Sequence, residues 1–317
     1  MKFKHLILTV TLIVSFYSCT QECDCLSLEE HGDTTYNPNE NSPYTGICTE
    51  KIYGMTKKIE YNNGKIDGKY TCWDEKGEKV YEDEFKNGKR NGKSTIWHKN
   101  GNKFEEKHYV NGEKEGKSLS WYKKGNKHLD CGYKKDKLDG KYTEWYENGK
   151  IKKETEYNEG LIHGKWVTWY ENGTEKEEGK YIQNNKVGTW KTWYENGKKK
   201  SKGEYINNLK HGKWIVWHEN ENEKSSGRYI EGKKEDLWVT WYENKKKKVI
   251  CNYKEGRKNG KFVSFFIDGH KKIEGQYFNG LKEGKFIVWG KNNKRKTILY
   301  KGGVASDTIE DSNIPVF

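Results

Sequence analysis

Residues Gly140–His163 read GKYTEWYENGKIKKETEYNEGLIH, and this stretch carries two strand-like segments and two turn signals. In the next copy of the pattern the first segment is Lys165–Tyr170 (KWVTWY), rich in the aromatic and β-branched residues that favour strands. Within Gly140–His163, Asn148-Gly149 follows the first segment, and this pair suits both left-handed positions of a type I′ turn. A second segment ends at Tyr157, before another glycine-bearing turn at Glu159-Gly160. The stretch therefore predicts a β-hairpin.

The same 24-residue pattern runs through most of the chain. Glycine marks the start of each unit, a large aromatic ring follows five residues later, and Tyr or Phe follows twelve residues after that ring. The marks are Gly68, Gly92, Gly116, Gly140, Gly164, Gly188, Gly212, Gly260 and Gly284, with Asp236 at the missing position. A shorter unit begins at Gly46 and reaches Tyr61 two residues early. Internal repeats of this kind predict a stacked array, here of eleven units.

This repeat predicts an all-β fold: an extended antiparallel meander of about eleven 24-residue β-hairpins, forming a twisted or curled single sheet. No segment has a sustained 3.6-residue apolar period, so we expect few helices. A β-solenoid is the alternative, but a type I′ turn folds a strand back beside itself. Centring the turn on Asn172-Gly173 pairs Glu171 with Thr174 and Trp166 with Gly179, so that an aromatic ring covers a glycine. Non-glycine residues at glycine positions predict local irregularities at Glu221, Asp236, Lys245 and Asn293.

Cysteine positions distinguish the two architectures. Counting back from Tyr61 and Phe85 places Cys48 and Cys72 at one phase of adjacent units. Equivalent residues are about 9.6 Å apart in a meander but about 4.8 Å apart in a solenoid, so only a solenoid would allow this pair to form a disulfide. Cys131 and Cys251 lie five units apart, about 48 Å in a meander, and we expect each to fill a slot that Gly or Thr takes elsewhere. A bridge from Cys23 or Cys25 to Cys48 stays open.

Composition limits the range of functions. The chain of 317 residues has a net charge of +13, with 60 basic and 47 acidic residues interleaved along it. Only four of the basic residues are Arg, the side chain best suited to bidentate phosphate contacts. We therefore expect a solvated mixed-charge surface and no nucleic-acid partner, with acidic lipid headgroups or glycans as electrostatic alternatives.

The first residues predict a secretion signal. Lys2 and Lys4 precede an apolar run that is too short to span a bilayer, and Ser18 precedes Cys19. The expected organisation is a signal peptide over residues 1–18, a lipidated Cys19 with a flexible tether over residues 19–43, the repeat array over residues 44–304 and a C-terminal tail over residues 305–317. Ser18-Cys19 resembles the lipobox of bacterial lipoproteins, although Phe16 and Tyr17 depart from it. This resemblance implies lipidation of Cys19 and an anchored position in the bacterial cell envelope, at the outer membrane or cell surface.

The repeat itself resembles a known family. Its GKW-aromatic opening, YENG turn, Lys/Glu strand and closing Tyr are similar to the MORN-repeat variant of bacterial YwqK-like proteins over residues 44–300. That resemblance implies stacked hairpins, contacts with proteins or phospholipids, and a label of antitoxin. Choline- and glucan-binding repeats share Trp, Tyr and Gly but match the pattern less well.

Catalysis is not expected. The sequence shows no nucleophile elbow, phosphate loop or metal-ligand spacing. It therefore predicts no catalytic residues, no cofactor-binding residues and no metal site. A Glu ladder beside the turns, including Glu147 and Glu171, repeats in every unit with Lys150 or Lys198 opposite, which favours exposed ion pairs over a catalytic carboxylate pair.

The aromatic rows are the candidate contact surface, because Tyr and Trp are common anchors of protein interfaces. Sheet packing is the alternative role for any single ring. The leading hypothesis is a non-catalytic, lipid-anchored scaffold that binds another protein, with toxin immunity and glycan binding as alternatives. The predicted contact residues are Trp145, Trp169, Trp193, Trp217, Trp241, Tyr157, Tyr181, Tyr205 and Tyr229.

Overall fold

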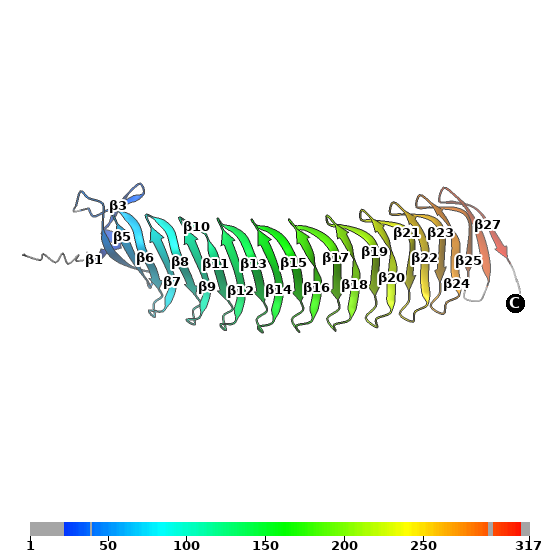
Figure 1. The fold of residues 1–317 in the computed structure, drawn as a ribbon, viewed down its shortest axis with the longest axis horizontal. Helices are drawn as coiled ribbons and strands as arrows, with labels where there is room; N and C mark the ends of the chain where they lie inside the picture. The colour runs from blue at the N-terminus through cyan, green and yellow to red at the C-terminus, as the bar shows by residue number, and fades with distance from the viewer. Residues whose placement is uncertain (1–21, 39, 291–293, 312–317) are drawn as a thin grey trace, which may run out of the picture. The chain divides into compact units, whose positions relative to one another are not determined.

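A computed structural model describes residues 22–38, 40–290 and 294–311 (Figure 1). The predicted signal peptide, Cys19 and Asn293 lie outside these residues. Contacts divide the chain into two compact units: unit 1 holds residues up to Gly101 together with Tyr109–Glu113, and unit 2 holds Asn102–His108 and the chain from Lys114 onward. The described residues contain no α-helix and one short 3-10 helix, η1 (Cys25–Ser27).

The strands follow one another with short connections. They are β1 (Glu22–Asp24), β2 (Glu29–His31), β3 (Thr34–Tyr36), β4 (Gly46–Ile52), β5 (Met55–Asn62), β6 (Lys65–Trp73), β7 (Lys79–Lys86), β8 (Lys89–Trp97), β9 (Lys103–Val110), β10 (Glu113–Lys114), β11 (Gly116–Trp121), β12 (Lys127–Lys134), β13 (Lys137–Trp145), β14 (Ile151–Asn158), β15 (Leu161–Trp169), β16 (Glu175–Ile182), β17 (Asn185–Trp193), β18 (Lys199–Ile206), β19 (Leu209–Trp217), β20 (Glu223–Ile230), β21 (Lys233–Trp241), β22 (Lys247–Lys254), β23 (Arg257–Phe265), β24 (Lys271–Phe278), β25 (Leu281–Trp289), β26 (Arg295–Lys301) and β27 (Val304–Asp311).

Each unit is an antiparallel meander. In unit 1, β4 to β8 pair in chain order. In unit 2 the same is true from β11 to β27, whose strands lie side by side in Figure 1. Every mark of the sequence repeat from Gly46 to Gly284 falls within a strand, in β4, β6, β8 and every odd-numbered strand from β11 to β25. The predicted all-β meander of consecutive hairpins is confirmed.

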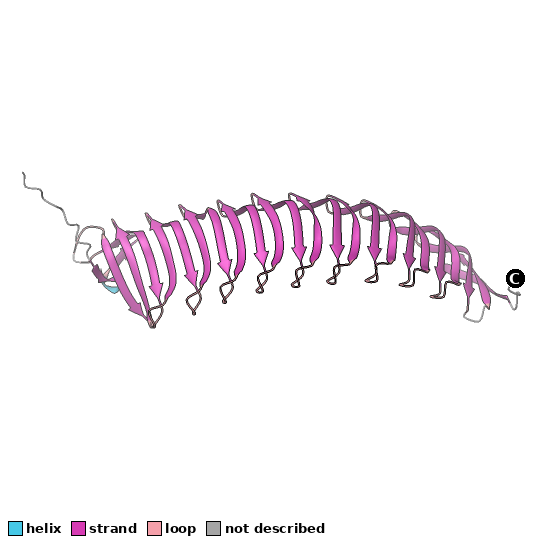
Figure 2. Cartoon of the chain, turned by 60° about the horizontal axis from the view of Figure 1, so that its bottom comes forward, coloured by secondary structure: helices cyan, strands magenta, loops and turns pink. Residues whose placement is uncertain are grey.

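The type I′ turn predicted at the Asn-Gly pair of the YENG turn does not form there. At the Glu171-Asn172-Gly173 turn only Gly173 has a left-handed φ (+89°), and the Tyr170 amide donates to the Thr174 carbonyl at 2.8 Å. This is a three-residue loop, in which a glycine follows the turn proper, not a type I′ turn. The predicted pairing of Glu171 with Thr174 is therefore wrong. In Figure 2 these longer loops lie along one edge of unit 2.

Type I′ geometry occurs at the opposite edge of the sheet, in the turns that join one 24-residue repeat to the next. Asn207 and Asn208 have φ values of 48° and 68°, and they join the paired residues Ile206 and Leu209. Two consecutive left-handed residues in a two-residue loop are the hallmark of that turn. We call this the tight-turn edge, and the other the long-turn edge.

The register along the strands is as predicted, but the ring that covers each glycine is a different one. Trp166 is the Cα partner of Gly179, because a bulge next to Trp169 absorbs the one-residue error at the turn. The ring that lies on Gly179 belongs instead to Trp190 of the following strand, whose Cδ2 atom would be 2.2 Å from an added Cβ. Trp190 is buried with 2% exposure, whereas Trp166 is half-buried.

Non-glycine residues keep the glycine backbone. Glu221, Asp236 and Lys245 have φ values of 68°, 58° and 66°, in the left-handed region that disfavours side chains with a Cβ. The expected local irregularities are therefore absent at these three positions, and the repeat geometry imposes the strain instead.

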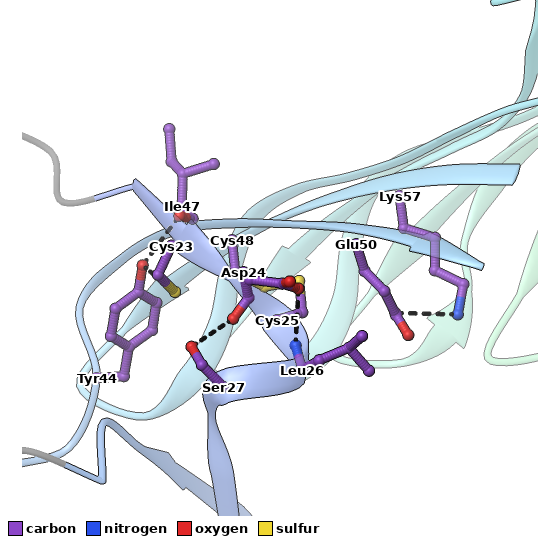
Figure 3. Close-up of a disulfide and its surroundings, with 10 residues drawn as sticks. All are labelled: Cys23, Asp24, Cys25, Leu26, Ser27, Tyr44, Ile47, Cys48, Glu50 and Lys57. Atoms are coloured by element: carbon purple, nitrogen blue, oxygen red, sulfur yellow. Dashed lines mark hydrogen bonds and ion pairs between the residues drawn. A yellow bond between two sulfur atoms is a disulfide. The ribbon is translucent and has the colours of Figure 1, made fainter.

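The predicted tether contains regular structure. β1 pairs in parallel with β4, β2 pairs with β3, and Cys25 is bonded to Cys48 (Figure 3). Tyr44, 1% exposed, packs with Cys48 and Ile59 in a small core. This short N-terminal segment covers an otherwise open side of β4 and so belongs to the folded unit 1.

The phase assigned to Cys48 and Cys72 is wrong. Cys48 pairs with Ile59, whereas Cys72 pairs with Lys57 and Tyr81, so the two cysteines occupy different positions of the repeat. The first 24-residue repeat is shorter than the others because its turn is shorter: Tyr53-Gly54 alone joins β4 to β5, with Ile52 opposite Met55. Cys72 is a free, buried thiol.

Cys131 and Cys251 occupy equivalent positions and are free and buried. They pair across the ladder with Tyr142 and Phe262, in the slots held elsewhere by Thr155 and Gly179, as predicted. At the C-terminal end, β27 continues the meander through Asp311, past residue 304 where the array was expected to end.

Candidate binding surface

Unit 2 carries a continuous line of aromatic rings. Alternating Trp and Tyr side chains meet edge to face, with ring centroids 4.9–6.5 Å apart. This geometry suits the charge distribution of aromatic rings and adds about 0.5–1.5 kcal/mol per pair beyond burial. We call this line the aromatic ladder; its members are Trp166, Tyr181, Trp190, Tyr205, Trp214, Tyr229, Trp238 and Tyr253.

The ladder takes only part of the predicted contact rows. Tyr181, Tyr205 and Tyr229 belong to it, and Tyr157 contacts Tyr142 at 5.3 Å. The predicted tryptophans Trp145, Trp169, Trp193, Trp217 and Trp241 instead end their strands at the long-turn edge, where they are half-buried. The predicted contact residues therefore lie in two separate parts of the sheet, with the tyrosines along the line of aromatic rings and the tryptophans at the long-turn edge.

At the long-turn edge, side-chain hydrogen bonds connect neighbouring 24-residue repeats. The Tyr146 hydroxyl donates to the Trp169 carbonyl at 2.8 Å, and the Asn148 amide donates to the Glu171 carbonyl at 2.9 Å. Equivalent bonds recur at Tyr170 and Tyr194. Tyr and Asn of the YENG turn are thus structural connectors between units.

A row of lysines lies over the aromatic ladder. The Lys210 ammonium is 4.4 Å from the ring centre of Trp214 and 5.2 Å from that of Tyr229, distances suited to cation–π attraction. Lys234 stands in the same way over Trp238 and Tyr253, at 4.3 and 5.0 Å. We call the set the lysine row; it comprises Lys186, Lys210, Lys234, Lys258 and Lys282, one from each of five consecutive units.

The lysines of this row differ from one another in whether a carboxylate balances their charge. Lys186 forms an ion pair with Glu177 at 2.8 Å, but the residue nine positions before the lysine is Ser201, Ser225 or Val249 in the next three units. Within the described residues, no carboxylate lies within ion-pair distance of Lys210, Lys234 or Lys258. Three half-buried ammonium groups therefore follow one another without a carboxylate partner.

Burial changes the acid–base behaviour of this surface. Removal from water lowers the pKa of Lys210 and of Lys234, with the neighbouring Lys210 and Lys258 charges adding to the effect at Lys234. Burial also raises the pKa of the ladder tyrosines, that of Tyr253 to about 12. The tyrosines are thus neutral at physiological pH, and the ammonium groups gain from an incoming anion.

Exposed aliphatic side chains line the tight-turn edge. Ile206 and Leu209 flank one type I′ turn and are 52% and 49% exposed. Ile182 and Ile230 hold the equivalent position of Ile206 in the neighbouring units and are also exposed. Clustered apolar exposure of this kind marks interaction surfaces. We call Leu161, Ile182, Ile206, Leu209 and Ile230 the aliphatic strip.

Other features offer less chemistry. A pocket of about 470 Å³ in unit 1 lies between turns and is lined by Tyr53, Lys79 and Trp97 among others. No group of three or more potential metal ligands occurs among the residues described, and no helix in that part of the chain has the length and apolarity to cross a membrane. The Lys150 ammonium binds the Asn172 carbonyl at 2.6 Å instead of a glutamate of the predicted ladder.

We did not predict from the sequence that the tryptophans of the aromatic ladder and the lysine row form one surface. The signal was present: the lysines recur at 24-residue intervals from Lys186 to Lys282, and the carboxylate at Glu177 is replaced in the next four units. Seeing it required the register, which places Lys210 opposite Tyr205 across the tight turn.

The fold and surface define a class, that of repeat proteins whose similar hairpins present one kind of surface many times over. Four segments of the chain match the family model described as the MORN repeat variant, at residues 90–111, 138–159, 162–183 and 186–207. MORN repeats are in general modules for protein or membrane binding. No curated protein matches the chain.

Proposed function

We propose that this protein is a non-catalytic scaffold of the bacterial cell envelope that binds another protein along its repeat array. The aliphatic strip carries the proposal, because it repeats an exposed apolar side chain at one position of successive units. A protein partner buries such side chains, whereas soluble glycans offer little apolar surface in return. Membrane attachment through a lipid on Cys19 is part of the proposal and rests on the sequence of residues 1–19.

Capture from native envelope fractions tests the scaffold. The full chain is compared with the variant Ile182→Ser/Ile206→Ser/Ile230→Ser, which removes three members of the aliphatic strip. The variant Glu175→Ser/Lys199→Ser/Glu223→Ser is the matched control, because it changes exposed residues at the same spacing. We expect one or more proteins to be retained by the wild type and the control and lost from the aliphatic variant.

Two other outcomes identify the alternative functions. Recovery of polysaccharide without any protein above background would contradict the scaffold and indicate glycan binding. Recovery of a secreted toxin, with protection of cells that express this chain, would narrow the scaffold to an immunity role.

A further inference from the structure

We propose that the lysine row of unit 2 binds an extended acidic segment of a protein, one that carries an acidic residue at every third position. This inference rests on the proposed function in one respect, that the partner is a protein, and it names the chemistry of the contact. The surface is distinct from the aliphatic strip, so the two can be tested separately.

The positive charge of the lysine row is unbalanced at three consecutive lysines. Lys210, Lys234 and Lys258 have no ion-pair partner among the described residues, while Lys186, at the same repeat position, is neutralised by Glu177. All four are half-buried and are held against aromatic rings. Their side chains are therefore already ordered, and an incoming carboxylate gains a charge-assisted hydrogen bond at a low additional cost in entropy.

The spacing of the lysine row matches the repeat of an extended peptide. Successive lysines of the row are two strands apart, or about 9.6 Å. A polyproline II segment has three residues per turn and rises about 3.1 Å per residue, so every third side chain points to one face at intervals of about 9.3 Å. An acidic residue at every third position would thus meet one lysine after another, and the flexible lysine stems can absorb the small mismatch.

The aromatic rings beside the lysines suit an extended segment that contains proline. Extended, proline-rich segments dock in grooves lined by aromatic side chains, because their conformation is already fixed before binding. Here the half-buried rings of Tyr205, Tyr229 and Tyr253 alternate with the lysines. Proline rings between the acidic residues would pack on these tyrosines while the carboxylates meet the ammonium groups.

Labelled peptides test the inference by fluorescence anisotropy with the full chain. The probe is a peptide of five Glu-Pro-Pro repeats. One control peptide has the same composition with its glutamates in a single block, and a second replaces Glu by Lys. We expect the periodic peptide to bind at least about threefold more tightly than the block peptide, and the basic peptide not to bind, because like charges repel.

Two protein variants locate the contact. Lys210→Gln/Lys234→Gln/Lys258→Gln removes the unbalanced charges, and Lys200→Gln/Lys224→Gln/Lys248→Gln removes the same charge from exposed lysines at another repeat position. We expect about a tenfold or greater loss of affinity in the first variant and less than about threefold in the second. Unfolding temperatures of both variants check that the fold is retained.

Several results would overturn the inference. Equal binding of the periodic and block peptides, or equal losses in the two variants, would mean attraction to net positive charge alone. Binding of anionic vesicles or of an acidic polysaccharide through Lys210, Lys234 and Lys258, with no peptide binding, would assign the row to another ligand. If the lysine variant still captures the envelope partner while peptides fail to bind, this inference fails and the proposed scaffold stands.

Discussion

The indole of Trp214 lies directly on the backbone of Gly203, its neighbour one strand earlier, and a Cβ added to Gly203 would be 2.1 Å from the indole Cδ2 atom. The same contact recurs between Gly227 and Trp238. Each glycine lets one tryptophan reach full burial, since Trp166, which follows Thr155 at this position, is only half-buried. Glycine thus allows the ring to lie against the backbone of the preceding strand.

Gly203→Ala is therefore expected to destabilise the chain by about 1–3 kcal/mol, the usual cost of forcing extra volume into a packed site. Urea unfolding measures the loss. Thr155→Val is the matched control: it keeps the Cβ and the side-chain volume and replaces a hydroxyl that has no hydrogen-bond partner with a methyl group, so its cost should stay below about 1 kcal/mol. Equal costs at the two positions would show that the ring contact does not limit packing.

Replacing strained residues at the long turns should stabilise the protein. Glu221→Gly and Lys245→Gly each relieve a side chain held at a left-handed φ of 68° or 66°, and each is expected to add about 1 kcal/mol to the free energy of unfolding. Glu219→Gly, in the same turn as Glu221 but without a positive φ, should give no gain. A gain at Glu219 equal to that at Glu221 would argue against relief of strain.

Loss of the Cys25–Cys48 disulfide should weaken unit 1. The bridge closes a loop with a sequence separation of 23, for which chain entropy predicts about 3 kcal/mol of stabilisation. Cys25→Ser is expected to expose Cys48 to thiol reagents and to lower the unfolding temperature of unit 1. Cys23→Ala, which leaves the bridge intact, is the control. Non-reducing peptide mapping should recover Cys25 joined to Cys48, with Cys72 free; a Cys23–Cys48 peptide would contradict the assignment.

Much of this fold follows from the sequence because the repeat applies one local rule many times. The 24-residue period and the Trp166–Gly179 pairing were predictable from residue spacing alone. The turn type was not, because Asn-Gly is compatible with either loop, and the choice depends on a bulge beside Trp169 that shifts the register by one residue before the turn. The ring over Gly179 could not be assigned either, since two tryptophans flank it and only three-dimensional packing selects Trp190.

The candidate surface was predictable only in part. Tyr181 and Tyr205 belong both to the predicted contact rows and to the aromatic ladder, but their lysine neighbours are indistinguishable in the sequence from ordinary solvated charge in a chain with 60 basic residues. Whether the charge of a lysine is balanced depends on a carboxylate of the neighbouring strand, such as Glu177 for Lys186. These two residues are nine positions apart in the sequence, and only the strand register shows that they meet.

The proposed lipid anchor on Cys19 makes a separate prediction. Cys19→Ala should abolish incorporation of labelled fatty acid and move the chain from the membrane to the soluble fraction, because the apolar run before Cys19 is too short to act as a spanning helix. Cys23→Ala tests the neighbouring cysteine and should leave labelling intact. A Cys19→Ala chain that remains labelled and membrane-bound would place the processing site elsewhere.

Lys210 should give the stability of unit 2 a specific pH dependence. Its folded pKa lies below the unfolded value of about 10.4 because burial disfavours the charged form. At neutral pH both states are protonated and the fold bears the desolvation cost; as pH rises from the folded pKa towards about 10.4, the folded state loses its proton first and wild-type stability rises relative to a variant without the charge.

Lys210→Met is therefore expected to be more stable than the wild type at pH 7, by about 0.5 kcal/mol because water still screens a half-exposed ammonium, and the difference should shrink towards pH 10. Urea unfolding at both pH values measures it, and titration of the tyrosines affects wild type and variant alike. Lys186→Met is the matched comparison: it leaves Glu177 without its partner, so it should lower stability at pH 7. A gain at Lys210 that is the same at both pH values would reflect apolar contact by the methionine and not removal of the buried charge.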